Sequence, residues 1–143
     1  MEKIGVKIKL LHPEAKLPVY ATEGSAGFDI YAIENVLIQP NEVKMIPTGL
    51  SFELPPGFHL QVWDRSGKAK VGMHHFAGIL DSDYRGELKV LLYNSTKELH
   101  QIEKGDRMVQ VLILPAYQAE FQEVKELSQT SRGEGGFHST GKK

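Results

Sequence analysis

The sequence predicts an all-β protein: one domain built as a jelly-roll-like sandwich or barrel, with at most one short helix. Three observations predict this class. Short stretches in which apolar and polar residues alternate recur along the chain. Turns that contain Gly or Pro separate these stretches at short intervals. No stretch shows the 3.6-residue period of a long helix, and no repeat or interior linker divides the chain.

Composition narrows the class further. The chain has 143 residues, which suits one domain, and its formal net charge of −1 argues against a nucleic-acid or anionic membrane partner. The absence of Cys excludes disulfides and thiolate chemistry. Met1 is followed by Glu2 and Lys3 rather than by the apolar core of a signal peptide, and no apolar run approaches membrane-spanning length. We therefore expect a cytoplasmic protein without a membrane or nucleic-acid partner.

The first half of the chain is expected to hold short strands. Val6 to Leu10 alternates apolar residues with lysines, and the Gly24 to Gly27 turn leads into a second strand. Pro40-Asn41 and Pro55-Pro56-Gly57 mark turns, and Pro47-Thr48-Gly49 marks a turn or a bulge. Between these breaks we expect strands at residues 28–32, 36–38, 43–46, 50–54 and 58–62.

The second half begins with the one helix candidate, in which Ser66 would cap Lys68 to Val71 and Gly72 would end the helix. Residues 78–93 are expected to form a β-hairpin around Asp and Gly turn residues. A polar, turn-like stretch, two further strands and a tail follow, at residues 94–104, 108–114, 120–124 and 128–143. The tail is rich in Ser, Thr, Gly and Lys and is expected to be flexible, so the domain itself would span residues 1–127.

Two carboxylates in the expected hairpin are candidates for chemistry. In an extended chain Asp81 and Asp83 would point to the same side, and repulsion between them would poise one of them as a base. The simpler alternative is that both residues only shape the turn. Spacing alone leaves both readings open.

Three further stretches carry polar groups suited to phosphate chemistry. Arg65, Ser66 and Gly67 follow a strand, where they would bind a phosphate or form an ordinary capped turn. Gln110 lies in an apolar strand. Its side-chain amide would either donate to phosphate or water, or lie in the core with its hydrogen bonds satisfied by the protein. Asp29 lies near the start of a strand. It would either accept hydrogen bonds from the water shell of a hydrated Mg²⁺ ion or cap a turn.

The tail contains the chemically most informative stretch, Arg132 to Lys142. Its glycines would let backbone N–H groups surround an anion, and Phe137 is an aromatic free to stack on a base. The stretch lacks the ending and context of a Walker P-loop, and the alternative is a disordered tail. The histidines lack metal-ligand spacing, so no zinc site is expected.

Taken together and in this order, these stretches resemble the five motifs of the trimeric dUTPase (dUTP nucleotidohydrolase) family over nearly the whole chain. The stretches are Ala26 to Ala32, Arg65 to Gly67, Gly78 to Gly86, Gly105 to Gln110 and Arg132 to Gly141. The resemblance implies a β-clip type of jelly roll and a homotrimer with active sites shared between subunits. It implies hydrolysis of dUTP to dUMP and pyrophosphate with Mg²⁺, which limits uracil in DNA and supplies dUMP for dTMP synthesis.

The resemblance also assigns roles to residues by their position. Asp81 looks like the base that activates the attacking water. Gln110 looks like a second catalytic residue, one that contacts phosphate and water. Tyr84 looks like the residue beneath the deoxyribose, and Asp29 like the outer-sphere partner of Mg²⁺. Phe137 would cover the uracil. The remaining substrate-binding positions implied are Arg65, Ser66, Gly67, Gly78, Lys89, Arg132, Gly136, Ser139 and Thr140.

The sequence departs from the family pattern at several positions. The loop after Gly67 is short, and His75 or Phe76 stands where many members carry an Asn that helps to read uracil. Lys68 and His138 replace a common apolar residue and a usual Gly. The related dCTP deaminases carry a catalytic Glu where this chain has Leu91, which disfavours deamination. A deaminase or other nucleotide hydrolase, and a non-enzymatic nucleotide-binding or assembly protein, remain the alternatives.

Overall fold

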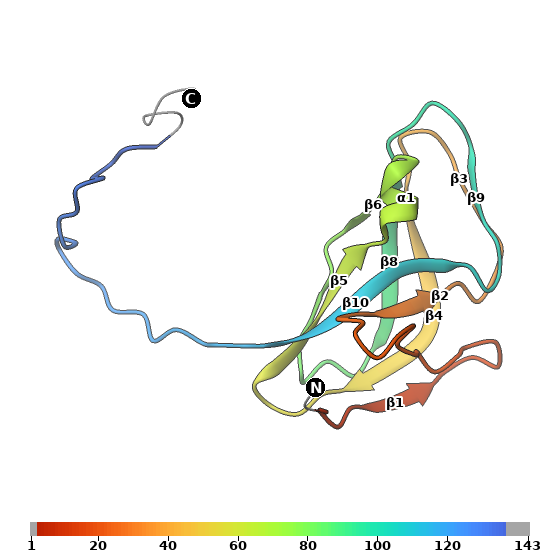
Figure 1. The fold of residues 1–143 in the computed structure, drawn as a ribbon, viewed down its shortest axis with the longest axis horizontal. Coiled ribbons are helices and arrows are strands. Elements are labelled where there is room, and N and C mark those ends of the chain that lie inside the picture. The colour runs from red at the N-terminus through yellow and green to blue at the C-terminus, as the bar shows by residue number, and fades with distance from the viewer. Residues whose placement is uncertain (1–2, 137–143) are drawn as a thin grey trace.

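Two four-stranded antiparallel sheets form the body of the protein in a computed structural model that describes residues 3–136 (Figure 1). The first sheet has the order β1-β4-β8-β6 and the second the order β2-β10-β5-β7. A two-stranded ribbon, β3-β9, adjoins them. The elements in chain order are β1 (Lys7–Leu10), β2 (Phe28–Tyr31), β3 (Val36–Ile38), β4 (Val43–Glu53), β5 (Phe58–Asp64), α1 (Ser66–Lys70), β6 (Met73–Phe76), β7 (Ile79–Leu80), β8 (Glu87–Asn94), β9 (His100–Ile102) and β10 (Arg107–Pro115).

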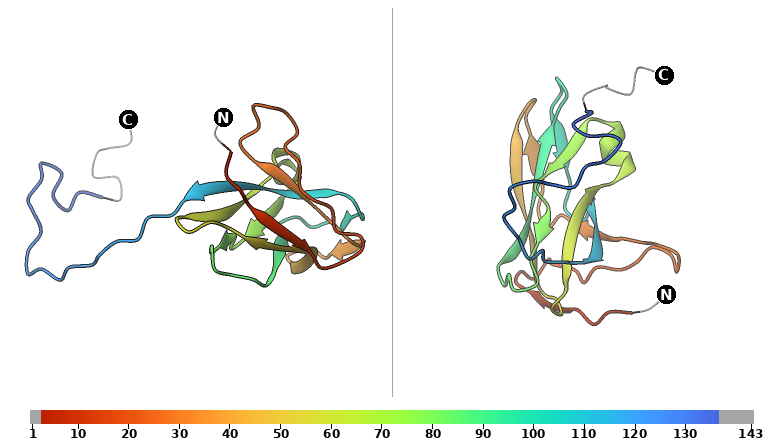
Figure 2. Two further views of the ribbon diagram at one scale, coloured as in Figure 1. Left: turned by 90° about the horizontal axis from the view of Figure 1, so that it is seen from below. Right: turned by 90° about the vertical axis from the view of Figure 1, so that its left-hand side faces the viewer.

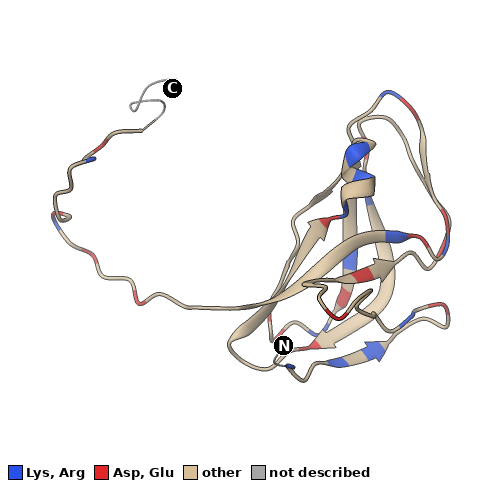
Figure 3. Ribbon diagram, in the orientation of Figure 1, with Lys and Arg blue, Asp and Glu red and all other residues tan. Residues whose placement is uncertain are grey.

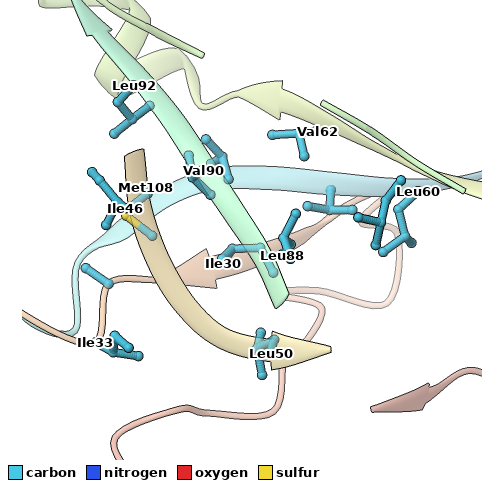
Figure 4. Close-up of a cluster of buried hydrophobic side chains, with 14 of the residues drawn as sticks. Ile30, Ile33, Ile46, Leu50, Leu60, Val62, Leu88, Val90, Leu92 and Met108 are labelled. Atoms are coloured by element: carbon cyan, nitrogen blue, oxygen red, sulfur yellow. The ribbon is translucent and has the colours of Figure 1, made fainter. Parts of the chain in front are cut away.

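The core lies between the two sheets because alternate residues of each strand point inward. Figure 4 shows Ile30, Leu60 and Met108 of the second sheet facing Ile46 and Val90 of the first. All five side chains are fully or almost fully buried. The all-β class with a single short helix, predicted from the alternation of apolar residues, is confirmed.

The β4 strand differs from the expectation of two short strands. Val43 to Glu53 forms one strand, and its pairing with β8 shifts register between Pro47 and Ser51. Gly49 within this bulge has a φ of +67°, and a side chain there would collide with Ala15 and His12. The sequence therefore located the irregularity correctly, but the chain continues in the same direction through it.

The expected hairpin at residues 78–93 is wrong. The β7 strand pairs with β5 in the second sheet, whereas β8 pairs with β4 and β6 in the first. Both edges of β8 are thus occupied, and residues 81–86 cross from one sheet to the other. The strands β6 and β9 were missed because each is very short and contains polar residues.

Past Pro115 the chain leaves the sheets. Residues 116–136 contain no strand or helix and run out to one side of the body in Figure 1 and in the left-hand view of Figure 2. The strand expected at residues 120–124 does not form, because no neighbouring strand is there to pair with it. Tyr117 and Phe121 are each 94% exposed in the single chain.

Candidate active site

The candidate site residues gather around two separate hollows, which have no lining residue in common. The first, here called the Gly78 groove, has a volume of about 340 Å³ and lies among β4, β5, β6, β7 and β8. The second, the Arg65 pocket, has a volume of about 530 Å³ and lies over β2, β5 and β10. Each contains members of different sequence motifs.

Strand register builds the Arg65 pocket. Gln110 of β10 is paired with Asp29 on one side and with Trp63 on the other. The three residues therefore form a row across the sheet, on the face opposite to the buried Ile30 and Val62. Alternation along each strand thus places polar groups outside while its neighbours fill the core.

Asp29 is held between two arginines in this pocket. Its Oδ1 atom lies 2.8 Å from Arg65 Nε, and its Oδ2 atom accepts a hydrogen bond of 3.2 Å from Arg107 Nη1. Figure 3 shows the acidic segment of β2 beside the basic start of β10. Two guanidinium groups against one carboxylate leave one positive charge, which suits a phosphate better than a cation.

The short helix opens differently from the expectation. Arg65, not Ser66, is the N-cap, and it makes no side-chain capping bond. Its carbonyl accepts hydrogen bonds from the backbone N–H groups of Lys68 and Ala69, both at 2.9 Å. Ser66 is instead the first helical residue and lines the Arg65 pocket, whereas Gly67 does not. The helix ends just before Gly72, as expected, and Gly72 has a φ of +81°.

Gly78 lines the groove named after it, where neighbouring side chains leave no room for a Cβ atom. Gly78 has a φ of +124°, and a Cβ there would lie 3.0 Å from Val62 Cβ and 3.3 Å from His75 Cδ2. Its carbonyl accepts a 2.8 Å hydrogen bond from the Val62 N–H, which fastens the segment to β5. The groove is also lined by Asp81, Tyr84 and Lys89 and by apolar residues that include Leu91.

The two carboxylates of this segment are not equivalent. A turn begins at Asp81, whose carbonyl accepts from the Tyr84 N–H at 3.2 Å, so the chain is not extended and does not align the two side chains. Asp81 lines the Gly78 groove, and Asp83 does not. Both border a third hollow beside Pro56 and His59. The geometry therefore favours Asp81 over Asp83 as the group that faces a ligand in the groove.

Tyr84 lies over the backbone of Gly86. A Cβ added at Gly86 would collide with the phenol ring, so only glycine leaves room for this ring position. The Tyr84 hydroxyl donates a 3.3 Å hydrogen bond to the Glu87 carbonyl, and the residue is 45% exposed. The ring is thus held at the rim of the groove with much of its surface open.

The β4 bulge anchors this crossing segment. The Ser51 hydroxyl donates to the Arg85 carbonyl at 2.7 Å, and the Gly49 N–H donates to Glu87 Oε1 at 2.8 Å. Buried Thr48 donates to the Leu88 carbonyl at 2.6 Å. The bulge that interrupts the β4–β8 ladder therefore supplies the donors that position the residues between Asp81 and β8.

A carboxylate with two histidines adjoins the groove. Asp64 accepts hydrogen bonds from His75 Nδ1 at 2.8 Å, from the His75 N–H at 2.7 Å and from His74 Nδ1 at 2.9 Å. Burial raises the pKa of Asp64, but these hydrogen bonds outweigh it and the pKa lies below its ordinary value. Sequence reasoning noted His75 only as a departure from a family pattern and missed its partner Asp64.

The sequence-based site is therefore divided. Asp29, Arg65, Ser66 and Gln110 meet in the Arg65 pocket. Another four meet in the Gly78 groove, namely Gly78, Asp81, Tyr84 and Lys89. Arg132 and Gly136 lie on the segment beyond the sheets, where Arg132 Nε donates to the Gly135 carbonyl at 2.8 Å. Phe137, Ser139 and Thr140 lie outside the described residues.

Within residues 3–136, no group of three or more His, Asp or Glu side chains is arranged to hold a metal ion. In the same range, no helix has the length and apolar character needed to cross a membrane.

Comparison with known proteins identifies the family. The dUTPase family model matches residues 13–141. The deoxyuridine 5'-triphosphate nucleotidohydrolase of Nautilia profundicola is 50% identical over 140 residues, covering 96% of this chain and 99% of the relative. That of Helicobacter pylori strain Shi470 is 45% identical over 139 residues, covering 95% and 96%.

Solved structures agree with the sequence comparison. The Staphylococcus bacteriophage 80alpha dUTPase with dUPNHPP has a TM-score of 0.86 at 28% identity, covering 96% of this chain and 98% of the phage chain. A mutant dUTPase from phage phi11 of S. aureus, in which a structural Mg(II) ion is coordinated, has a TM-score of 0.82 at 23% identity, covering 87% and 99%. The family model and the two relatives span nearly the whole chain, and the chain therefore belongs to the dUTPase family.

Proposed function

We propose that this protein hydrolyses dUTP to dUMP and pyrophosphate, with Asp81 as the base that activates the attacking water. Family membership supports the reaction, and the phage 80alpha relative binds the nucleotide dUPNHPP. The observation that carries the residue assignment is the placement of Asp81 in the Gly78 groove, beside Tyr84 and Lys89. An exposed carboxylate at the rim of an apolar groove suits a base next to a bound nucleoside.

In the proposed reaction the water oxygen bonds to the α-phosphorus as its proton passes to Asp81. The bond from that phosphorus to the bridging oxygen breaks, and pyrophosphate leaves with the electron pair. Arg65 and Ser66 would bind phosphate oxygens, and Gln110 would contact phosphate or water. Tyr84 would pack against the deoxyribose, and Lys89 would contact the substrate from β8.

The residues of the Arg65 pocket fit Mg²⁺ only as an ion that contacts the protein through its bound waters. The carboxylate of Asp29 is already paired with Arg65 and Arg107, and the described residues contain no carboxylate cage. The ion would therefore bind through the triphosphate and keep several waters, with Asp29 accepting from one of those waters. When bound, it would neutralise charge on the phosphates.

The active site would be shared between the subunits of a homotrimer. The Gly78 groove and the Arg65 pocket are separate in one chain, which supports a site in which each hollow comes from a different subunit. Exposed apolar side chains on one face of the first sheet, including Met45 and Phe76, suit a subunit contact. The tail with Arg132, Gly136, Phe137, Ser139 and Thr140 would close over the assembled site.

Incubation with dUTP and Mg²⁺, followed by product analysis, tests this function. We expect dUMP and pyrophosphate from dUTP, with little product from dCTP or dTTP. Release of ammonia from dCTP would point to a deaminase instead, although Leu91 in the groove offers no group that transfers protons. Intact dUTP after prolonged incubation would overturn the proposal in favour of a binding or assembly protein.

A further inference from the structure

The side chain of Arg85 reaches back to the turn that precedes it. Its Nη1 atom donates to the Ser82 carbonyl at 2.7 Å and to the Tyr84 carbonyl at 3.2 Å. Each Nη atom of a guanidinium carries two hydrogens, so one nitrogen supplies both bonds. The side chain therefore closes the turn a second time, in addition to the 3.2 Å bond from the Tyr84 N–H to the Asp81 carbonyl.

The main chain of Arg85 is fixed from the opposite side. Its carbonyl accepts a 2.7 Å hydrogen bond from the hydroxyl of Ser51, a buried residue of β4. Residues 81–86 lie between β7 and β8 and belong to neither strand, so the sheets do not hold them directly. Arg85 thus has its main chain bonded to the first sheet and its side chain bonded to the turn.

The turn has physical reasons to open. Asp81 and Asp83 are exposed carboxylates two residues apart, and their like charges repel. The bond between the Tyr84 N–H and the Asp81 carbonyl is long, and water competes with it at the surface. A guanidinium bonded within the same turn offsets the repulsion and adds two charge-assisted hydrogen bonds. Arg85 therefore opposes opening of the turn.

The carboxylate of Glu53 contributes less to this arrangement. Its Oε2 atom lies 4.0 Å from Arg85 Nε, whereas its Oε1 atom bonds to Lys7 Nζ at 2.6 Å. The Arg85 and Glu53 side chains are both about half exposed, and such ion pairs contribute little to stability. The two carbonyls, rather than the ion pair, therefore hold the guanidinium in place.

We propose that Arg85 is a positioning residue for Asp81, because its bonds to the turn keep the Asp81 carboxylate at the Gly78 groove. This rests on the proposed function, in which Asp81 is the base. Asp81 lines the groove and Arg85 does not, so Arg85 acts through the turn and not through contact with the nucleotide. A catalytic group that is misplaced by about 1 Å costs up to about 10²-fold in rate. The loss should therefore fall on kcat more than on KM.

Kinetics on matched variants test the proposal. Arg85→Ala removes both carbonyl bonds, Arg85→Lys keeps a charge and hydrogen-bond donors, and Glu53→Gln is the control that weakens only the ion pair. We expect Arg85→Ala to lower kcat for dUTP about tenfold with little change in KM, Arg85→Lys to lose less, and Glu53→Gln to match the parent protein. An unchanged kcat in folded Arg85→Ala would overturn the proposal.

A double variant shows whether Arg85 acts through Asp81. In Asp81→Asn protein the base is already absent, so adding Arg85→Ala should lower the residual rate only slightly. A purely structural defect would instead reduce the rate by the same factor in both backgrounds. The same tenfold loss with and without the Asp81 carboxylate would therefore overturn the positioning role.

Hydrogen exchange separates this inference from the proposed reaction. The Tyr84 amide bonds to the Asp81 carbonyl, so its exchange rate in the free protein reports whether the turn is closed. Arg85→Ala should speed this exchange about tenfold and leave the Val62 amide, which bonds to the Gly78 carbonyl, unchanged. Unchanged Tyr84 exchange would overturn the role of Arg85 even if dUTP is hydrolysed. Full activity of Asp81→Asn would overturn the assigned base instead, and faster Tyr84 exchange would still support closure of the turn by Arg85.

Discussion

The side-chain amide of Gln110 donates a 2.8 Å hydrogen bond to the backbone carbonyl of Asp64. Asp64 therefore takes part in both hollows, because its carbonyl binds Gln110 of the Arg65 pocket and its carboxylate binds His75 of the Gly78 groove. The bond engages one N–H of the Gln110 amide and leaves the carbonyl oxygen Oε1 near Gly27. Gln110 thus retains one donor and one acceptor for phosphate or water.

Gln110→Met tests this amide. Methionine has similar length but no donor, so the Asp64 carbonyl loses its partner, at a cost of about 0.5–1.5 kcal/mol in the free energy of unfolding. We expect a modestly lower urea midpoint and a clearly lower kcat for dUTP. Gln61→Met is the control, since Gln61 lies on the neighbouring strand β5 but outside the Arg65 pocket. Equal turnover in both variants would remove Gln110 from the reaction.

Asp81→Asn tests the proposed base. The amide keeps the size of the side chain but takes up no proton, and loss of a general base typically costs about 10²–10⁴-fold in rate. We expect kcat to fall by such a factor while dUPNHPP binding persists in calorimetry. The control is Asp83→Asn, because Asp83 lies in the same turn but not in the groove. If Asp83→Asn carries the larger loss, the assignment of the base is reversed.

Sugar selection is expected to depend on Tyr84 and the glycine beneath it. Tyr84 would pack where the 2′-hydroxyl of UTP projects, so UTP should be a poor substrate and Tyr84→Ala should narrow the difference from dUTP. Gly86→Ala should act in the same direction, because the added methyl group displaces the phenol ring. The measurement is the ratio of kcat/KM for dUTP and UTP. An unchanged ratio in both variants would exclude Tyr84 from the sugar site.

Acid stability should depend on Asp64. Its pKa is lower in the folded protein than in the unfolded chain, so the unfolded chain takes up the proton first as the pH falls. The stabilisation is present above the unfolded value of about 4 and is lost as the pH falls below it toward the folded pKa. Urea unfolding of Asp64→Asn should show lower stability near neutral pH and a smaller gap from the parent at low pH. A gap that stays constant with pH would contradict the linkage.

Much of the fold was predictable from local pattern. Alternation marked β5, an apolar stretch marked β10, and Pro47 to Gly49 marked the bulge, because all three signals come from neighbouring residues. The partner of β7 was not predictable in this way. Ile79 and Leu80 are followed by turn residues and a long strand, which is a hairpin pattern, but both edges of β8 are taken by distant strands.

The sequence predicted which residues form the site but not how they are arranged around one another. Arg65 and Asp29 were both expected near phosphate or metal, but nothing in the spacing revealed that they form an ion pair at 2.8 Å. Likewise His74 and His75 lack metal-ligand spacing with any nearby carboxylate in sequence. Their partner Asp64 is brought to them by the turn through α1, a contact between β5 and β6 that composition does not encode.

The separation of the two hollows leads to a prediction about assembly. Asp81 is in the Gly78 groove and Arg65 is in the other pocket, so each substitution should inactivate a different half of a shared site. In a trimer that contains both kinds of subunit, a site can then combine an intact groove from one chain with an intact pocket from its neighbour. A site built within one chain would always retain one of the two defects.

Subunit mixing distinguishes these cases. Asp81→Asn and Arg65→Gln proteins, each nearly inactive, are unfolded together in urea in equal amounts, refolded and assayed with dUTP. Random assembly should restore both intact halves in about a quarter of the sites, so activity should rise to about a quarter of that of refolded parent protein. Each variant refolded alone is the control. Mixtures that remain as inactive as the separate variants, although sedimentation shows mixed trimers, would place the whole active site within a single chain.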